Sequence, residues 1–295
     1  MHYTRAAAML PSDAVPSDTA YAFLADLIYR HSRIRLGADK HALVAGRLVR
    51  RLQSLGYRSF DDYCDMLRST AADEEIGVVI DLVTTNHTHF FREPAHFDFL
   101  ASDVLPAVAR ASQAEDRPCR VWCAAAASGE EAYSLAIVLA ERARASPGMR
   151  WRVHASDISR RMLDRCRLAV YTAERVRLPD AAWLSRYFRR GFGEREGRYR
   201  VKPDLRGHVD VERINLFQPA YHLPPGLDVI FCRNAMIYFD VESRQELVQR
   251  LFEQLAPGGH LFIGHTESLL GLRHSFESVR PGVYRRPVRG GGWPR

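Results

Sequence analysis

The sequence has few cysteines and no long apolar run. The five cysteines among its 295 residues lack the pairing and spacing of a zinc site or a disulfide framework: Cys64, Cys119, Cys123, Cys166 and Cys232. No apolar stretch reaches the roughly 20 residues that a membrane-spanning helix needs. Residues 1–17 contain no apolar core of a signal peptide. We therefore expect a soluble cytoplasmic protein with free thiols.

Charge is the strongest compositional signal. Lysine and arginine number 42 against 35 acidic residues, a formal net charge of +7. An excess of positive charge favours an acidic partner, which is a nucleic acid, an anionic membrane surface or an acidic protein. Hydrophobic residues make up 46%, so the chain can form an ordinary globular core.

The first third of the chain predicts an all-helical domain over residues 18–84, after a disordered segment over 1–17. Apolar residues recur at helical spacing in 20–31, in 40–55, after the capping residue Ser59, and in 76–83. The second of these helices carries Arg47, Arg50 and Arg51 on its polar side. A one-signed arginine cluster is typical either of a solvated helix face or of a binding face.

Strands and helices alternate over residues 119–288, which predicts a doubly wound, mainly parallel α/β sheet. We expect strands at 121–124, 151–156, 209–214, 228–232 and 260–264, with helices between them. Residues 178–205 interrupt the alternation and predict an inserted β-subdomain. We expect residues 85–118 to form a linker and cofactor-contacting segment, and 289–295 a disordered tail.

Ligands of such sheets bind outside the carboxyl ends of the strands. The segment after the first strand, AAAASGEE over 124–131, is made of small residues followed by Glu130 and Glu131. A pyrophosphate would favour G-x-G-x-x-G at this place and be repelled by carboxylates. The segment therefore favours a ligand with hydroxyl, ammonium or sulfonium groups, although glutamates at a helix start also suit the helix dipole.

Polar residues follow two further strands. Asp157 ends the second strand, where an acid accepts hydrogen bonds from ribose hydroxyls or caps the next helix. Arg233 and Asn234 follow a buried apolar strand, and Tyr238 comes one helical turn later. A charged group and an amide at such a place indicate a ligand or partner, since burying them unpaired is costly.

A fourth polar segment, TTNHTHFFRE over 84–93, joins the helical part to the sheet. Its polar residues alternate with aromatics. His87 and His89 suggest a metal, but no further ligand follows at metal-site spacing, so we predict no metal site.

These segments together resemble the CheR family of chemotaxis receptor methyltransferases. The resemblance covers about residues 20–286 and rests on TTNHTHFFRE, WCAAAASGEE, HASDIS, INLFQ and IFCRNAMIYFD, in the order of the family. It implies a class I S-adenosylmethionine-dependent methyltransferase (Rossmann-like) domain, an all-helical N-terminal domain and a small inserted antiparallel β-subdomain. Ala127 and Ser128 depart from the Ser–Thr that the family often has, and both remain small.

The resemblance also implies functional positions. The implied contacts of the cofactor S-adenosylmethionine are Asn86, Thr88, Arg92, Glu131, Asp157, Asn215, Leu216, Arg233 and Asn234. Arg92 would pair with a carboxylate of the cofactor or of the substrate, and Tyr238 would line the transferred methyl group. Arg47, Arg50 and Arg51 would face the receptor. Gly191, Gly193 and Gly197 match the glycine spacing with which some members dock a receptor tail, although a hairpin needs glycines anyway.

The implied reaction agrees with the residues present. A glutamate side chain is ionised at pH 7, so it attacks a methyl group without a general base, and no obvious acid–base pair stands out in the sequence. Methyl transfer mainly needs orientation, which supplies ~7–11 kcal/mol in well-placed reactants. The products are a glutamate methyl ester and S-adenosylhomocysteine.

Two other functions stay open at this point. The charge suits a nucleic-acid methyltransferase, but Arg233–Asn234–Ala235–Met236 lacks the prolines that such enzymes usually place after this strand. A non-catalytic S-adenosylmethionine-binding signalling module would keep the same cofactor contacts. We expect instead an enzyme that acts as a monomer on the cytoplasmic helical region of chemoreceptors, does not bind nucleic acid and does not insert into membranes.

Overall fold

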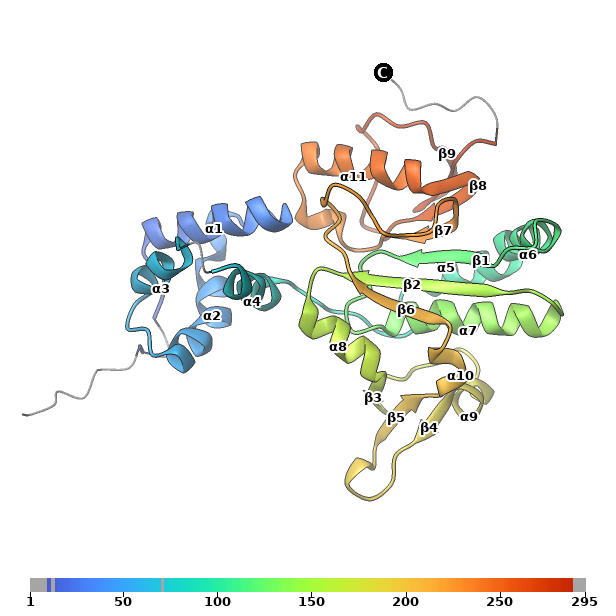
Figure 1. Cartoon of the computed structure of the whole chain (residues 1–295), viewed down its shortest axis with the longest axis horizontal. Helices are drawn as coiled ribbons and strands as arrows, with labels where there is room; N and C mark the ends of the chain where they lie inside the picture. The colour runs from blue at the N-terminus through green and yellow to red at the C-terminus, as the bar shows by residue number, and fades with distance from the viewer. Residues whose placement is uncertain (1–9, 12–13, 70–71, 289–295) are drawn as a thin grey trace, which may run out of the picture. The chain divides into compact units, whose positions relative to one another are not determined.

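The computed structural model describes residues 10–11, 14–69 and 72–288 and divides into two compact units, Met1–Thr85 and Asn86–Arg295 (Figure 1). Most of the segments that we expect to be disordered, 1–9, 12–13 and 289–295, lie outside the described residues. Within 1–17, Leu10 is buried and its carbonyl accepts a hydrogen bond from Gln53, while Ser17 caps the first helix. These described residues are ordered, which differs from the disorder that we expect there.

The first unit is all helical, as expected. It contains α1 (Asp18–Ser32), the short η1 (Ala38–Lys40), α2 (His41–Leu55), α3 (Phe60–Leu67) and α4 (Asp73–Val83). The hydroxyl of Ser59 accepts from the amide of Asp62 and so caps α3, which confirms the predicted helix start. The apolar faces meet in a core that includes Leu24, Leu48 and Tyr63, each fully buried.

The second unit begins with a helical stretch that the sequence analysis assigns to a linker. It comprises α5 (Pro94–Phe99), the π-helical η2 (Leu100–Val104) and α6 (Leu105–Ala114). Pro94 occupies the first turn of α5, where its missing N–H costs nothing. Leu100 and Leu105 are fully buried, and these apolar contacts explain why the stretch is helical rather than irregular.

A seven-stranded sheet forms the centre of this unit, in the order β6-β2-β1-β7-β8-β10-β9. β6 (Val209–Arg213), β2 (Trp151–Asp157), β1 (Cys119–Cys123), β7 (Leu227–Phe231) and β8 (Leu255–Phe262) are parallel neighbours. β10 (Val283–Arg285) and β9 (Glu277–Arg280), which we did not expect, extend the sheet in antiparallel fashion. β1 pairs with both β2 and β7, so the strand order reverses beside β1.

Helices cover both faces of this sheet, as in a doubly wound fold (Figure 1). α7 (Glu130–Ala145) and α8 (Arg160–Leu168) pack against β2 and β6, whereas α11 (Val241–Gln254) packs on β8. Side chains alternate accordingly along β1. Val121 and Cys123 join the core that contains residues of α7, while Trp122 joins the core that contains residues of α11.

A small antiparallel sheet with the order β3-β5-β4 forms the inserted subdomain. Its strands are β3 (Val170–Thr172), β4 (Phe188–Arg190) and β5 (Arg198–Val201), accompanied by α9 (Ala182–Tyr187), η3 (Gly193–Arg195) and α10 (Pro203–Arg206). The sheet begins at Val170, earlier than the expected start at 178, because β3 pairs with β5 across the intervening chain.

A buried aspartate stabilises the large sheet at the amino ends of its parallel strands. Asp228, at the start of β7, accepts two hydrogen bonds of 2.8 Å from the guanidinium of Arg117 and one of 2.8 Å from the amide of Arg120. Among the described residues, no helix is long and apolar enough to span a membrane.

Candidate active site

The candidate site lies at the carboxyl edge of the parallel strands. β1, β2, β6 and β7 end next to residues 124–131, Asp157, Asn215 and Arg233, respectively. Because neighbouring parallel strands end at the same edge, the topology brings four of the predicted segments together there. The fifth, residues 86–93, reaches the same edge through the contacts of Glu93.

Asp157 connects two of these strand ends. Its carboxylate is buried and accepts the amide N–H of Ala127 at 2.9 Å and that of Ser159 at 2.9 Å. The hydroxyl of Ser159, not Asp157, caps α8 by accepting from Met162. Asp157 is therefore not the N-cap of α8, which was one of the two roles that its sequence position allowed. A carboxylate has about four acceptor sites, so these bonds are compatible with an acceptor role toward hydroxyl groups.

A buried guanidinium holds three further segments together. The side chain of Arg233 has no exposed surface and forms ion pairs of 2.8 Å with Glu131 and 2.9 Å with Glu93. It also donates a 2.5 Å hydrogen bond to the carbonyl of Arg92. The end of β7, the first turn of α7 and the 92–93 segment are thus tied to one cation. Arg233 and Glu131 are both predicted site residues, but their pairing is not evident from the sequence.

The electrostatics of this cluster follow from burial and from the single cation. Burial raises the pKa of Glu131, which the charge of Arg233 opposes. Burial also acts to raise the pKa of Glu93, but its hydrogen bond and ion pair with Arg233 hold that pKa below the ordinary value. The structure gives the side chains of Arg233 and Glu131 a positioning role, and their contact with a cofactor stays a prediction.

The 86–93 segment is anchored by its aromatics and leaves its polar residues at the surface. Phe90 and Phe91 are buried, and Phe91 donates its amide to the hydroxyl of Ser134 at 2.9 Å. Asn86, Thr88 and Arg92 remain partly exposed, and the guanidinium of Arg92 donates to the carbonyl of His87 at 3.0 Å. The alternation of polar and aromatic residues in the sequence corresponds to this division.

The cluster that most resembles a metal site does not contain the two histidines of this segment. His87 and His89 are exposed, whereas ligand atoms of Glu93, His96 and His265 lie within 4.8 Å of one another. The Glu93 oxygen in this cluster already pairs with Arg233 and accepts the amide of His265 at 3.1 Å. The ion-pair network accounts for this carboxylate, and we assign the cluster no metal.

The loop after β6 carries Asn215 and Leu216. The amide side chain of Asn215 accepts from the backbone of Phe217 at 3.0 Å, and Leu216 is buried. The hydroxyl of Tyr221 donates to the carbonyl of Leu216, while Arg250 of α11 donates to that of Gln218 at 2.5 Å. These bonds fix the loop from behind.

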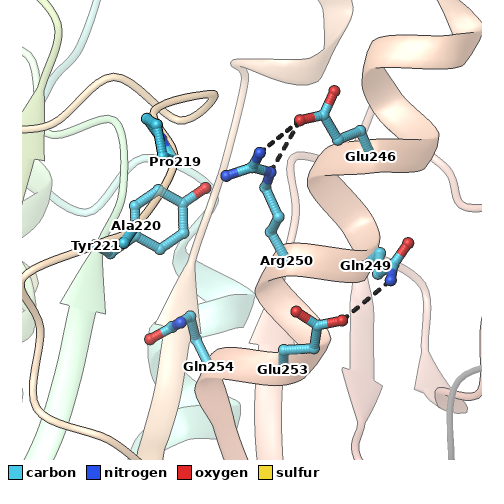
Figure 2. Close-up of a pocket in the computed structure, with 8 residues that line it drawn as sticks. All are labelled: Pro219, Ala220, Tyr221, Glu246, Gln249, Arg250, Glu253 and Gln254. Carbon is cyan, nitrogen blue, oxygen red and sulfur yellow. Dashed lines mark hydrogen bonds and ion pairs between the residues drawn. The ribbon is translucent and has the colours of Figure 1, made fainter.

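A cavity of about 330 Å³ separates this loop from α11. Figure 2 shows Arg250 reaching from α11 toward the loop, beside Glu246, with which it pairs at 2.7 Å. Pro219 and Tyr221 form the opposite wall. The cavity is lined by residues of α11 and of the loop that carries Asn215, and it includes no residue of the predicted site. We therefore assign it no ligand.

The loop after β7 contains Asn234 and Tyr238. Asn234 has a left-handed backbone conformation, with φ of 59°, and its amide lies 3.4 Å from Glu93. Tyr238 is partly exposed at the end of η4 (Met236–Tyr238). Glu267, which the sequence analysis does not single out, accepts amide hydrogen bonds from this loop. An acid three residues after Gly264, at the end of a short turn, gives no distinctive sequence signal.

The predicted receptor-binding arginines of α2 differ in their surroundings. Arg50 is exposed, whereas Arg51 pairs with Glu75 through two hydrogen bonds of 2.9 and 2.5 Å. Arg47 donates to the carbonyl of Val83 and, at 2.9 Å, to the hydroxyl of Thr85. The structure therefore gives Arg47 and Arg51 partners within the first unit, and Arg50 is the member of the three that best suits an external partner.

The predicted tail-docking glycines lie in the hairpin between β4 and β5, and each has a local structural reason. A Cβ atom on Gly191 would lie 2.1 Å from the carbonyl oxygen of Arg195. Gly193 and Gly197 have positive φ angles of 58° and 73°. Turn geometry thus accounts for all three, and tail docking stays a prediction.

Comparison with known proteins identifies both units. Residues 86–284 match the family description "CheR methyltransferase, SAM binding domain", and residues 19–84 match "CheR methyltransferase, all-alpha domain". The chain is 42% identical to a chemotaxis protein methyltransferase of Escherichia coli over 91% of each chain. It is 40% identical to chemotaxis protein methyltransferase 2 of Pseudomonas aeruginosa, over 87% of this chain and 89% of the relative.

Replacing Arg233 tests the ion-pair cluster. Arg233→Met would leave Glu93 and Glu131 buried without their cation, and we expect the free energy of unfolding at pH 8 to fall by about 3–5 kcal/mol. The pKa values of both carboxyls would then rise, so the folded variant would bind protons more tightly than the unfolded chain. Its stability should therefore recover partly as the pH falls from 8 to 5.

The wild type should recover less stability than Arg233→Met over this pH range, because its Arg233 holds the pKa of Glu93 below the ordinary value and opposes the rise in the pKa of Glu131. Arg285→Met is the matched control, since Arg285 forms an exposed ion pair with Glu277 and should contribute less than about 1 kcal/mol. Urea denaturation at both pH values measures the difference. Equal losses for the two variants would contradict the central role of Arg233.

Proposed function

The chain belongs to the CheR methyltransferase family and is an S-adenosylmethionine-dependent methyltransferase, and we propose that it methylates glutamate side chains of bacterial chemoreceptors. The products would be glutamate methyl esters and S-adenosylhomocysteine, and the reaction would serve chemotactic adaptation. The five cysteines are free and buried, which suits the reducing cytoplasm where we place the enzyme.

The observation that carries the proposal is that the carboxylates at the site are already engaged in ion pairs or in hydrogen bonds to backbone amides. Glu93 and Glu131 pair with Arg233, and Asp157 and Glu267 accept backbone amides. None of these four is placed as a general base that could deprotonate an amine or a hydroxyl group. An acceptor that is already ionised at pH 7, such as a glutamate, needs no such base.

The same edge suits the cofactor. The buried carboxylate of Asp157 can accept hydrogen bonds from hydroxyl groups, and the small, partly exposed Ala125 lets a ligand approach the backbone beside it. We assign the cofactor to these groups together with Asn86, Thr88, Asn215, Leu216 and Asn234. When bound, S-adenosylmethionine would supply a methyl group on a sulfonium.

Arg92 and Tyr238 are our candidates for contact with the reacting groups. Both are partly exposed in segments that end at the carboxyl edge, and Arg92 has a charge that can pair with a carboxylate. The ring of Tyr238 offers an apolar face beside a hydroxyl group, which suits the lining of a methyl group. We assign neither a proton transfer, because the proposed acceptor is already ionised.

Receptor contacts are proposed for the basic helix and for the small sheet. Arg50 is exposed on α2 and suits the acidic surface of a receptor helix. β4 is an edge strand of the small sheet and could pair with an extended receptor tail, next to the 81% exposed ring of Phe192. We expect the enzyme to act as a monomer.

Labelled methyl transfer tests the proposed function. Receptor-enriched membranes incubated with the enzyme and methyl-labelled S-adenosylmethionine should acquire label that mild base releases as volatile methanol, since methyl esters hydrolyse in base and methylated amines do not. Total RNA should acquire none. Base-stable label in the membranes would contradict ester formation. Label in RNA would favour a nucleic-acid methyltransferase, and no transfer despite S-adenosylhomocysteine binding would favour a non-catalytic module.

Reversing one exposed charge tests the basic helix. Arg50→Glu should raise the receptor KM by roughly 2–5-fold at low salt, which corresponds to the weak energies of exposed ion pairs. The defect should shrink at high salt, because salt screens such pairs. Arg144→Glu, at the exposed end of α7, makes the same charge change and should leave KM unchanged.

The cofactor KM and the kcat of Arg50→Glu should equal those of the wild type. A normal receptor KM at low salt would show that Arg50 is only solvated. An equal rise in the Arg144→Glu control would show that net charge, rather than the α2 face, determines the affinity.

A further inference from the structure

A turn that follows β8 places a carboxylate under the loop that carries Asn234 and Tyr238. Glu267 is only 8% exposed, although no cation among the described residues pairs with its carboxylate. Its two oxygens instead point at backbone amides. Burial raises the pKa of Glu267, and the amide hydrogen bonds act in the opposite direction.

The amides come from two turns at the carboxyl edge. One carboxylate oxygen accepts from Asn234 at 2.8 Å and from Gly264 at 2.6 Å, and the other accepts from Met236 at 2.7 Å. The backbone of Ile237 adds a further hydrogen bond. Successive amides that converge on one anion form the arrangement known as a nest, and here the anion belongs to the protein itself.

The nest depends on a left-handed backbone conformation at one residue. Asn234 has a φ of 59° and is followed by residues in right-handed conformations. Asparagine tolerates the left-handed region better than other residues that have a Cβ atom, but the surroundings must still select it. Glu267 supplies that constraint, because its carboxylate binds the amides of Asn234 and Met236.

We call the Glu267 carboxylate and the amides that it binds in the Asn234–Tyr238 loop the clamp. Gly264 is independent evidence that the groups of this clamp are closely packed. A Cβ atom on Gly264 would lie 2.4 Å from the side-chain nitrogen of Asn234 and 2.9 Å from a carboxylate oxygen of Glu267. A side chain at this position would therefore push apart the two groups that the clamp holds together. The contact places Asn234, Gly264 and Glu267 in one packed unit.

We infer that Glu267 is a positioning residue for methyl transfer, acting through the Asn234–Tyr238 loop. Its carboxylate fixes the conformation of Asn234, from which η4 leads to Tyr238. Both of its carboxylate oxygens accept backbone amides, so we assign it a positioning role and not a catalytic one. The inference rests on the proposed function for the identity of the methyl acceptor and for the roles of Asn234 and Tyr238.

Glu267→Gln tests the inference, because it replaces one carboxylate oxygen by an amide nitrogen. That nitrogen is a donor and cannot accept a hydrogen bond from a backbone amide of the loop. We expect kcat for receptor methylation to fall 10–100-fold, in line with the cost of small misplacements of reacting groups. The Kd for S-adenosylhomocysteine should rise less than tenfold, since Asn234 is one of several proposed contacts.

Asp228→Asn is the matched control. Asp228 is also buried and also binds a backbone amide, but at the opposite end of β7. The control should lose stability and keep its kcat. A kcat of Glu267→Gln within twofold of the wild type, in folded protein, would overturn the inference, as would an equal loss of kcat in Asp228→Asn.

Gly264→Ala tests the same contact without removing a polar group, so it can be measured even if Glu267→Gln does not fold. It should lower kcat. If both single variants fold, combining them should lower kcat little further, since both act on one loop. A normal kcat in folded Gly264→Ala would count against the clamp.

Amide hydrogen exchange separates this inference from the proposed function, because it needs no acceptor. Exchange at residues 234–237 should be at least tenfold faster in Glu267→Gln and unchanged in Asp228→Asn. Unchanged exchange in Glu267→Gln would contradict the clamp even if the wild type methylated a different acceptor.

Discussion

The candidate site depends on one buried cation. Arg233 lies among Glu93, Glu131 and the carbonyl of Arg92, with its side chain fully removed from solvent. Breaking such a cluster is costly, because the groups left behind are buried charges. The guanidinium therefore fixes the relative positions of the 92–93 segment, α7 and β7, and those three segments carry or border most of the predicted site residues.

Strained backbone concentrates around this cation. Phe91, Glu93, Ala127 and Asn234 all have positive φ angles, and all lie in the segments that converge on the carboxyl edge. Buried hydrogen bonds hold three of these segments: Ser134 binds Phe91, Asp157 binds Ala127, and Glu267 binds Asn234. An edge that is held in this way is arranged before any ligand arrives, which suits a reaction that depends mainly on orientation.

Much of the fold could be predicted from local sequence patterns. The alternation of apolar strands and amphipathic helices gives the parallel sheet, and Ser59 marks the start of α3, because both signals lie within a few residues. The α5–α6 stretch and the start of the small sheet at Val170 escaped prediction. The first packs through contacts that only the fold supplies, and β3 pairs with a strand far along the chain.

The sequence nominates the members of the candidate site, whose contact with a ligand stays a prediction, but it does not reveal how their side chains pair. Asp157 stands out because strand ends in this fold face the ligand, and motif resemblance points to Arg233 and Glu131. That Arg233 pairs with Glu93, 140 positions away in sequence, depends on the topology. Glu267 gave no signal at all, because its role is to bind backbone amides, which no side-chain pattern records.

A crystal structure of the protein with S-adenosylhomocysteine would test the central claim most directly. We predict the ligand outside the carboxyl ends of β1 and β2, with its ribose hydroxyls within hydrogen-bonding distance of Asp157. Arg233 should still pair with Glu93 and Glu131. A ligand bound elsewhere, for instance in the cavity beside Arg250, or an Arg233 side chain that leaves both glutamates to bind the ligand, would contradict the account.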